Sequence, residues 1–421
     1  MHFLARRFAA SLLLGCVVVA QAAPPAAAAA VHGRLETHAG LRVLRVWGSP
    51  AERGYAHGRL VGKDVSTVLI AEFTARFARQ PQLLQQARSA IGRLIVYPDD
   101  VTAEIEALFA GLCDSGADRR MPDLGREFDL TDLLVANALD VFGLMGCSSF
   151  TLYGDQVEGG GVLTGRNFDW PLTGPHMLDG TLLIVQHPTE GAAVASVGWP
   201  GYVGTVTGVS SEGYVAYLHV GSANVTWTPE PESWPSAVAA RATLLQARAA
   251  DGAAAVELAR SLLDYTSPPA GFLTHLVLPR VPADAPPFAV FETDAERCVL
   301  GERTAAAAVV TNHFHTRTDG RKASRDSLDR ERRVRGGIDR CLAEGDLHVS
   351  TAEAWDLLRD VDRGGGHAFG TLHSLLFRHE PWCFELRVAT LDGRKVVAAP
   401  DSERRLVLTR EQVFGDGAVP K

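Results

Sequence analysis

The sequence predicts a layered α+β protein in which antiparallel sheets are covered by helices. Helix-type spacing of apolar residues dominates up to about residue 144, and short strands separated by Gly-rich turns follow between residues 149 and 220. A second set of helices and a second set of strands come after them. A Gly-rich βαβ fingerprint is missing, which argues against a dinucleotide-binding fold.

The elements are justified in chain order by their periodicity. Residues 41–47 alternate apolar and basic side chains, as a strand does. Apolar residues recur every three or four positions in the next segments, which predicts helices over 54–94, 101–112 and 130–144. The strands predicted next cover residues 150–153, 162–168, 182–186, 193–197 and 213–219. Helices are then expected over 237–249 and 253–263, strands over 273–311, helices over 324–341 and 351–358, and strands over 371–408.

Composition limits the class of partner. The chain has 421 residues, a formal net charge of −8 and 46% hydrophobic residues, as a globular protein does. Lys and Arg form no basic cluster, so nucleic acid is not an expected partner. Six cysteines in a chain of this length do not make a disulfide framework.

The first 22 residues have the pattern of a signal peptide. Arg6 and Arg7 precede the apolar run from Phe8 to Ala20, and Ala20-Gln21-Ala22 is a small-x-small cleavage site. The alternative is a lipoprotein cleavage box ending at Cys16, which would then carry a lipid. We expect an exported protein, periplasmic or secreted, with a mobile tail over residues 23–39 and one domain over residues 40–421. No later apolar run is long enough to span a membrane.

A metal and a cofactor are not expected. His313 and His315 are two residues apart and would share one face of a strand, as metal ligands can. A carboxylate or third histidine at a suitable spacing is lacking near them, so the prediction is that no metal is bound.

The most informative stretch surrounds a cysteine. Gly146-Cys147-Ser148-Ser149 lies where helix gives way to strand, and Gly165-Arg166-Asn167-Phe168-Asp169-Trp170 follows on the next strand. A hairpin between the two strands can place Arg166 and Asp169 beside Cys147. A thiol becomes a nucleophile as the thiolate, which a nearby guanidinium favours.

These two motifs together resemble the acyl-coenzyme A:6-aminopenicillanic acid acyltransferase family of self-cleaving cysteine N-terminal-nucleophile hydrolases. Three other patches are similar to the same family and occur in its order: Arg53-Gly54-Tyr55-Ala56-His57-Gly58, Thr311-Asn312-His313-Phe314 and Ser327-Leu328-Asp329-Arg330. The strands over 371–388 resemble the family's closing pair, so the resemblance runs from about residue 40 to residue 390.

The resemblance implies a four-layer αββα sandwich and a precursor that cuts its own bond between Gly146 and Cys147. Cleavage would free the α-amine of Cys147. An α-amine has a pKa of about 7.7–8.0 in model peptides and can act as a general base, whereas the amide nitrogen of the precursor cannot. The two fragments are expected to stay associated, and the precursor is expected to be an inactive zymogen.

The resemblance also assigns roles. Asp169 matches the carboxylate that orients the new α-amine, and Arg166 matches the guanidinium beside the nucleophile. Asn312 matches the residue whose amide helps to hold the oxyanion, and Arg330 matches a distant arginine, with Arg332 and Arg333 as competing assignments. Each also has a structural interpretation. Arg166 and Asp169 would be an ion pair, Asn312 a turn residue, and Arg330 a charge on a solvated helix.

The expected activity is hydrolysis of a linear amide through a Cys147 thioester, with acyl transfer to an amine as a second outcome. N-acylated amino acids, acylated lactones, small peptides and bile-salt-like conjugates are all open as substrates, and nothing specifies a coenzyme A site. Two alternatives remain. One is a papain-like cysteine protease that uses Cys147 with His313, and the other is an exported binding protein that has kept the fold but lost catalysis.

Overall fold

The computed structural model describes residues 30–138, 146–171, 176–221, 232–248, 252–301, 306–319, 322–343, 347–363, 369–392 and 395–415. The predicted signal peptide (residues 1–22), Cys16 and the first part of the predicted tail lie outside these residues. From Val31 onward the chain forms one compact unit.

The predicted tail over residues 23–39 is wrong at its C-terminal end. Residues Gly33–His38 form strand β1, which pairs antiparallel with β2 (Leu41–Gly48) across a tight turn at Ala39 and Gly40. Ala39 and Gly40 both have positive φ, which the turn requires and which Gly40 adopts without strain. The alternation of polar and apolar residues in β1 is weak because β1 is an edge strand.

Most described strands belong to two sheets. In sheet 1 the order is β1-β2-β7-β8-β9-β10-β11-β12-β13. The bounds beyond β2 are β7 Leu182–Pro188, β8 Val194–Gly198, β9 Thr207–Ser210, β10 Val215–Val220, β11 Phe272–Val277, β12 Phe288–Thr293 and β13 Cys298–Leu300. All neighbours pair antiparallel except β2 and β7, which are parallel.

Sheet 2 is antiparallel and carries the cysteine motif. Its order is β14-β5-β6-β15-β16-β19. The bounds are β5 Gly146–Tyr153, β6 Val162–Pro171, β14 Ala308–Val310, β15 Phe369–Arg378, β16 Cys383–Val388 and β19 Arg405–Leu408. Short two-stranded pairs are formed by β3 (Arg120–Met121) with β4 (Arg126–Glu127) and by β17 (Thr390–Asp392) with β18 (Lys395–Val397).

The two sheets share one apolar layer. Side chains from both sheets contribute to a single buried cluster that includes Val43, Val185 and Val209 of sheet 1 and Phe377 and Leu386 of sheet 2. Burying the apolar face of each sheet against the other removes both from water, which is the main stabilising contribution in such packing.

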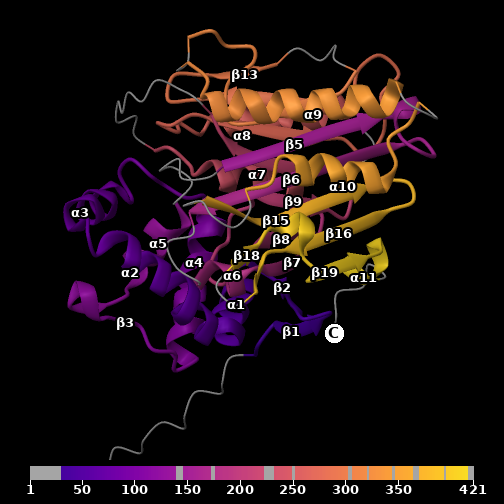
Figure 1. Ribbon diagram of the computed structural model, residues 1–421. Coiled ribbons are helices and arrows are strands. Elements are labelled where there is room, and N and C mark those ends of the chain that lie inside the picture. Colours follow the sequence, from indigo (N-terminus) through magenta and orange to yellow (C-terminus); the bar gives the residue numbers. More distant parts are fainter. Residues whose placement is uncertain are drawn as a thin grey trace, which may run out of the picture. The chain divides into compact units, whose positions relative to one another are not determined.

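Helices cover the outer faces. Helices α9 (Arg325–Ala343) and α10 (Thr351–Asp360) lie over β5 and β6 and bury a cluster with Phe150 and Leu163 (Figure 1). Helices α7 (Ser236–Gln246) and α8 (Gly252–Leu263) cover sheet 1 at Ala216 and Phe291. The predicted four-layer αββα arrangement is therefore confirmed.

The remaining helices come mainly before β5. They are α1 (Pro50–Asp64), a π-helical turn η1 (Val65–Ile70), α2 (Ala71–Phe77), α3 (Pro81–Ala90), α4 (Asp99–Asp114), α5 (Leu130–Asn137), α6 (His176–Gly180) and α11 (Arg410–Phe414), with short 3₁₀ turns η2 (Pro122–Leu124), η4 (Gly154–Gln156) and η5 (Ala399–Asp401). Among the described residues, none of the helices is both long and apolar enough to cross a membrane.

The first family-like patch is a helix-packing motif. A Cβ atom on Gly54 or Gly58 would lie 2.0 Å from the carbonyl oxygen of Glu104 or Leu108, so only glycine lets α1 approach α4 this closely. Arg53 of the same patch pairs with Glu104, which Arg241 of α7 also contacts. His57 is buried and its Nε2 accepts a hydrogen bond from the amide of Gly201. This contact gives His57 a structural role in joining α1 to the Gly201 turn.

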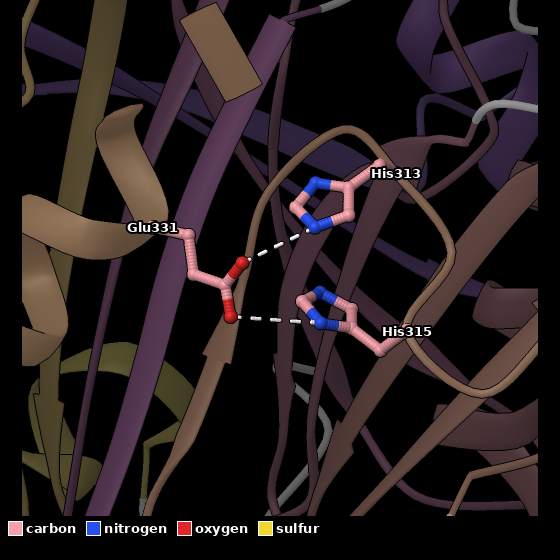
Figure 2. Close-up of side chains that lie close together, drawn as sticks. All are labelled: His313, His315 and Glu331. Atoms are coloured by element: carbon pink, nitrogen blue, oxygen red, sulfur yellow. Dashed lines mark ion pairs between the residues drawn. The ribbon is translucent and has the colours of Figure 1, made fainter. Parts of the chain in front are cut away.

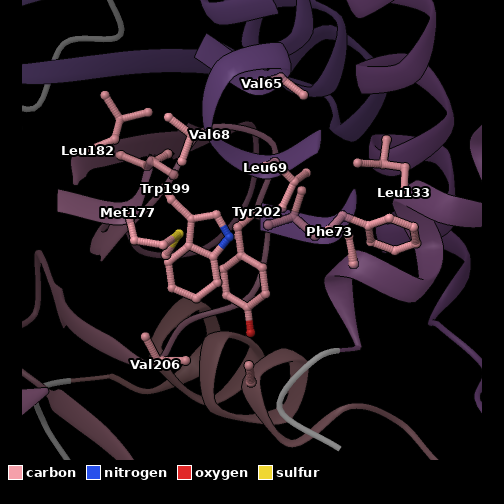
Figure 3. Close-up of a cluster of buried hydrophobic side chains, with 14 of the residues drawn as sticks. Val65, Val68, Leu69, Phe73, Leu133, Met177, Leu182, Trp199, Tyr202 and Val206 are labelled. Carbon is pink, nitrogen blue, oxygen red and sulfur yellow. The ribbon is translucent and has the colours of Figure 1, made fainter. Parts of the chain in front are cut away.

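A large apolar cluster joins these helices to sheet 1 near the start of β5. Trp199 and Tyr202 stack with ring centroids 4.3 Å apart, and Val68 and Leu69 of η1 pack beside them (Figure 3). Cys147 belongs to the same buried cluster. The Cys147 side chain, at the start of β5, thus packs partly against apolar groups.

Most predicted elements are found close to their expected positions. The capping box that begins at Ser350 is present at the start of α10. Strand β9 and helix α6 were not predicted, because each is only four or five residues long. The helix predicted over 130–144 is described as far as Asn137, and residues 139–145 lie outside the described part.

Candidate active site

The two faces of β5 present different groups. Side chains alternate along a strand, so Cys147, Ser149 and Thr151 share one face and Ser148 and Phe150 share the other. Cys147 and Ser149 face sheet 1, where they contact Leu218 and His219 of β10. Phe150 packs into the cluster beneath α9 and α10. The sulfur of Cys147 therefore lies between the sheets.

Arg166 lies beside that sulfur. β5 pairs with β6 so that Ser149 is opposite Arg166 and Cys147 is opposite Phe168, which puts Arg166 on the inner face diagonal to Cys147. Its Nη2 is 2.9 Å from the Cys147 Sγ and donates to the carbonyl of Leu218 at 2.8 Å. Nη1 donates to the carbonyl of Val206. The predicted contact between guanidinium and nucleophile is present.

Burial opposes the effect of this guanidinium. Removal from water raises the pKa of the Cys147 thiol to about 11, although Arg166 and Arg330 pull the pKa down. The Asp169 carboxylate adds a smaller upward contribution. The raised pKa keeps the sulfur as a thiol at neutral pH. Arg166 by itself lowers the pKa of the thiol, as expected. The net pKa is nevertheless raised, because the effect of burial is larger.

Asp169 lies on the opposite face of sheet 2, against Gly146. The two residues are direct partners in the β5–β6 pairing, and a Cβ on Gly146 would lie 3.1 Å from the Asp169 carboxylate. Oδ1 accepts a hydrogen bond from Thr371 at 2.6 Å. Oδ2 is buried, lies 3.4 Å from Arg363 Nε, and accepts no hydrogen bond from the residues that the structure describes. Asp169 and Arg166 lie on different faces, so the alternative of an ion pair between them is not what the structure shows.

Asn312 hydrogen-bonds to the backbone nitrogen of Cys147. It follows β14, the edge strand next to β5, and its Oδ1 accepts from the Cys147 amide at 2.9 Å. Its Nδ2 donates to the carbonyl of Val220 at 2.9 Å. The Asn312 amide group is therefore directed at the Cys147 nitrogen and at β10. The predicted role as oxyanion donor stays a prediction.

Arg330 is the arginine that reaches the site. From α9 it donates to the carbonyl of Cys147, to Ser148 Oγ at 2.8 Å and to Asn312 Oδ1 at 2.8 Å. Arg332 and Arg333 are exposed and contact Asp329 and Asp360 instead. The competing assignments are therefore excluded by geometry, and Arg330 is not a solvated charge, since its side chain is only 6% exposed.

His313 is not a partner of the cysteine. Its Nδ1 lies 2.8 Å from Ser327 Oγ, and its Nε2 lies 3.1 Å from Glu331 Oε2. Among the described residues, the hydrogen-bond partners of the sulfur are Arg166 and the Leu218 carbonyl. In the described part of the chain, Cys147 and His313 therefore do not form the pair that a papain-like protease needs.

Several contributors were missed by the sequence analysis. Thr371 and Arg363 support Asp169, and Ser327 donates to Thr311 while accepting from the Asn312 amide at 2.8 Å. Glu331 joins His313 and His315, although it stands on a helix that begins ten residues later. One indication of these contributors was present in the sequence. The motifs identified as family-like already contained Thr311, Asn312, Ser327 and Arg330.

The chain is similar to known proteins in sequence and in structure. A sequence model described as "Acyl-coenzyme A:6-aminopenicillanic acid acyl-transferase" matches residues 157–391, more than half of the chain. The match includes Arg166, Asp169, Asn312 and Arg330 and begins after Cys147. An uncharacterized protein of Archaeoglobus fulgidus is 29% identical over 194 residues, which are 41% of this chain and 32% of that protein. The chain thus matches about a third of that relative's length.

Three solved structures are similar at low identity. A conjugated bile acid hydrolase from Clostridium perfringens is 11% identical, with 62% of this chain and 96% of that chain covered and a TM-score of 0.41. Penicillin V acylase from Agrobacterium tumefaciens is 15% identical, with 61% and 88% covered and a TM-score of 0.40. The Caenorhabditis elegans ortholog of N-acylethanolamine-hydrolyzing acid amidase is 14% identical, with 55% and 93% covered and a TM-score of 0.40.

The family assignment rests on the sequence model. The match extends over most of both sheets, from the turn before β6 to β17, and includes four of the five predicted catalytic side chains. The chain belongs to the acyl-coenzyme A:6-aminopenicillanic acid acyl-transferase family.

Proposed function

We propose that this protein is an amidase, with acyl transfer as a second outcome, activated when the chain cuts itself between Gly146 and Cys147. One observation carries the proposal. The Cys147 sulfur lies 2.9 Å from a buried guanidinium, and the Cys147 nitrogen lies 2.9 Å from Asn312 Oδ1. Both the nucleophile and the nitrogen that would become its base are thus individually held.

Self-cleavage would proceed by an N-to-S acyl shift. The Cys147 sulfur attacks the carbonyl carbon of Gly146, the C–S bond forms, and the C–N bond breaks as the thiol proton passes to the departing nitrogen. Water then hydrolyses the resulting thioester, which returns the thiol and leaves a carboxylate on Gly146. That carboxylate would lie beside the Asp169 carboxylate, so charge repulsion would favour its departure.

The amidase reaction would use the freed α-amine as the base. The amine accepts the thiol proton, the thiolate attacks the substrate carbonyl, and the protonated amine gives its proton to the leaving nitrogen. Asp169 supports this role, because its buried Oδ2 lies close to Gly146 and accepts no hydrogen bond from the described residues. Arg166 would stabilise the thiolate. Water or an amine then attacks the thioester and releases the acyl group.

Contacts across the proposed cut support fragments that stay together. Strand β2, upstream of the cut, pairs along its length with β7, downstream of it. Buried polar contacts add to this pairing, since Asn137 Oδ1 accepts from the Val203 amide and Glu104 pairs with Arg241. Breaking such contacts would leave buried polar groups unsatisfied, which is costly. We also propose that residues 1–22 direct export.

An amide panel tests the proposal. It comprises N-acylated amino acids, acylated lactones, short peptides and bile-salt-like conjugates, and release of the amine or of the lactone is the readout. We expect turnover of at least one acyl amide by the wild-type protein and by a Cys113→Ser control, whose cysteine is exposed. We expect none from Cys147→Ala. Equal turnover by wild type and Cys147→Ala would contradict the proposal.

A further inference from the structure

A second cluster of chemically active side chains lies on the far side of Asn312. The loop after β14 carries His313 and His315, and both imidazoles face the carboxylate of Glu331 on α9 (Figure 2). His313 Nε2 is 3.1 Å from Glu331 Oε2, and His315 Nδ1 is 3.6 Å from Glu331 Oε1. The centroids of the two imidazole rings are 4.4 Å apart.

These separations are close to those of a metal site. A tetrahedral zinc ion bound at about 2.0–2.1 Å separates its ligand atoms by about 3.4 Å. One nitrogen from each ring and one carboxylate oxygen here lie within 4.8 Å of one another. Movements below about 1 Å would bring them to bonding distance, and two imidazoles with one carboxylate are a ligand set that zinc and other late divalent metals accept.

The ligands are supported by a second layer of contacts. His313 Nδ1 lies 2.8 Å from Ser327 Oγ, which fixes the ring and leaves Nε2 directed at Glu331. The buried carboxylate of Glu292 accepts backbone hydrogen bonds from His315, Thr316 and Arg317 and so fixes the loop. Partners of this kind orient metal ligands in known sites.

The group that opposes a metal can move. Arg335 Nε lies 2.8 Å from Glu331 Oε1, but the Arg335 side chain is 46% exposed and can turn into solvent. His315 and Arg335 line a cavity of about 360 Å³ with Phe288 and Val290. Of the three proposed ligands, His315 borders this cavity.

We propose that His313 Nε2, His315 Nδ1 and Glu331 form a site for a zinc-type divalent cation. The site would act as a clamp on the nucleophile's supports. His313 adjoins Asn312, and Glu331 adjoins Arg330, so a cation bound by both ligands fixes the two residues that hold the Cys147 backbone. The prediction from sequence that no metal is bound is replaced by this proposal, because the required carboxylate comes from a different element.

Titration of the full-length protein, without a histidine tag and after chelator treatment, tests the site. Zn²⁺ binding is followed by calorimetry, and Co²⁺ is used as a spectroscopic probe. We expect one ion per chain, with visible Co²⁺ bands of tetrahedral intensity and no thiolate charge-transfer band. His315→Ala and Glu331→Gln should each weaken binding by more than about 100-fold, since even loss of a supporting partner costs 10–100-fold.

Matched variants make the result specific. His38 on β1 also faces a glutamate at 3.0 Å but has no second histidine in that ion pair, so His38→Ala should leave binding unchanged. Arg335→Gln should tighten binding by about tenfold, because a competing cation is lost. Absence of binding, binding that persists in His315→Ala and Glu331→Gln, or a Co²⁺–thiolate band would each overturn the proposal. None of these readouts requires amidase activity.

Discussion

The Nη2 atom of Arg166 lies 2.9 Å from the sulfur of Cys147, and both side chains are fully buried. The guanidinium stabilises a thiolate, while burial disfavours every charged form. Burial prevails in the uncut chain, where the pKa of the thiol is raised to about 11. The sulfur therefore needs a base before it can act on a substrate, and the amine released by cleavage would be that base.

Arg166→Met should lower both turnover and stability, whereas Arg166→Lys should lower turnover less. Methionine removes the charge and the two guanidinium hydrogen bonds to the carbonyls of Val206 and Leu218, at about 0.5–1.5 kcal/mol each. These carbonyls keep the Leu218 amide and the Cys147 thiol as their other donors. We expect kcat/KM to fall on the order of 100-fold in Arg166→Met. Enzyme kinetics and urea unfolding on the same samples check this. Lost stability with unchanged kcat/KM would assign Arg166 a structural role only.

Arg330→Ala should slow self-cleavage and turnover by about 100-fold, as loss of a preorganised donor does. It removes the bonds to the Cys147 carbonyl, Ser148 and Asn312. Arg332→Ala is the matched control two residues along the same helix, because Arg332 is exposed and contacts Asp329. Band intensities of precursor and fragments over time provide the measurement. Equal rates in the two variants would contradict the assignment.

Gly146→Ala should slow self-cleavage by about tenfold, which corresponds to about 1.4 kcal/mol in the barrier. Its Cβ would lie 3.1 Å from the Asp169 carboxylate, which must move to admit it. Gly146→Val should be slower still. Once cut, residue 146 no longer belongs to the catalytic fragment, so kcat of the processed fraction should match wild type. A reduced kcat in that fraction would mean that residue 146 still influences the site.

Stability should fall as pH drops from 6.5 towards 5. Burial lowers the pKa of His275 to about 3 and the pKa of His219 and of His373 well below the ordinary value. The unfolded chain binds these protons near pH 6.5 and the folded chain does not, so acid favours unfolding. Each histidine contributes about 1.4 kcal/mol per pH unit below 6.5.

Urea unfolding of the uncut Cys147→Ala variant at pH 7.5, 6.0 and 5.0 measures this slope. Together the three histidines can change the free energy of unfolding by at most about 4 kcal/mol per pH unit. His275→Asn should remove about one third of the slope contributed by these residues. A free energy of unfolding that is flat over this range would show that the histidines are protonated in the folded state.

The sequence predicted the strands and helices well because the sheets and their covering helices have clear periodicity. It also singled out Cys147, Arg166 and Asp169, which stand in two motifs on consecutive strands. Asn312 and Arg330 were identified through the family resemblance of their motifs. It failed where contacts join distant elements. The Glu331 carboxylate meets His313 only through packing of α9 on sheet 2, and spacing along the chain does not show this.

The face of sheet 2 on which Asp169 lies is a second feature that the sequence did not predict. The hairpin argument placed Asp169 and Arg166 together beside Cys147, but three residues along a strand reverse the face. Arg166 contacts the sulfur between the sheets, and Asp169 packs against Gly146 on the helix side. The pairing of strand β1 with β2 was missed for a different reason, since an edge strand needs little apolar alternation.

Intact mass and N-terminal sequencing of the purified wild-type and Cys147→Ala proteins test the central claim most directly. The account predicts two wild-type fragments, the second beginning at Cys147, and a single uncut Cys147→Ala chain without amidase activity. A wild-type chain that stays intact while hydrolysing amides, or a Cys147→Ala chain that is cut at the same bond, would contradict it.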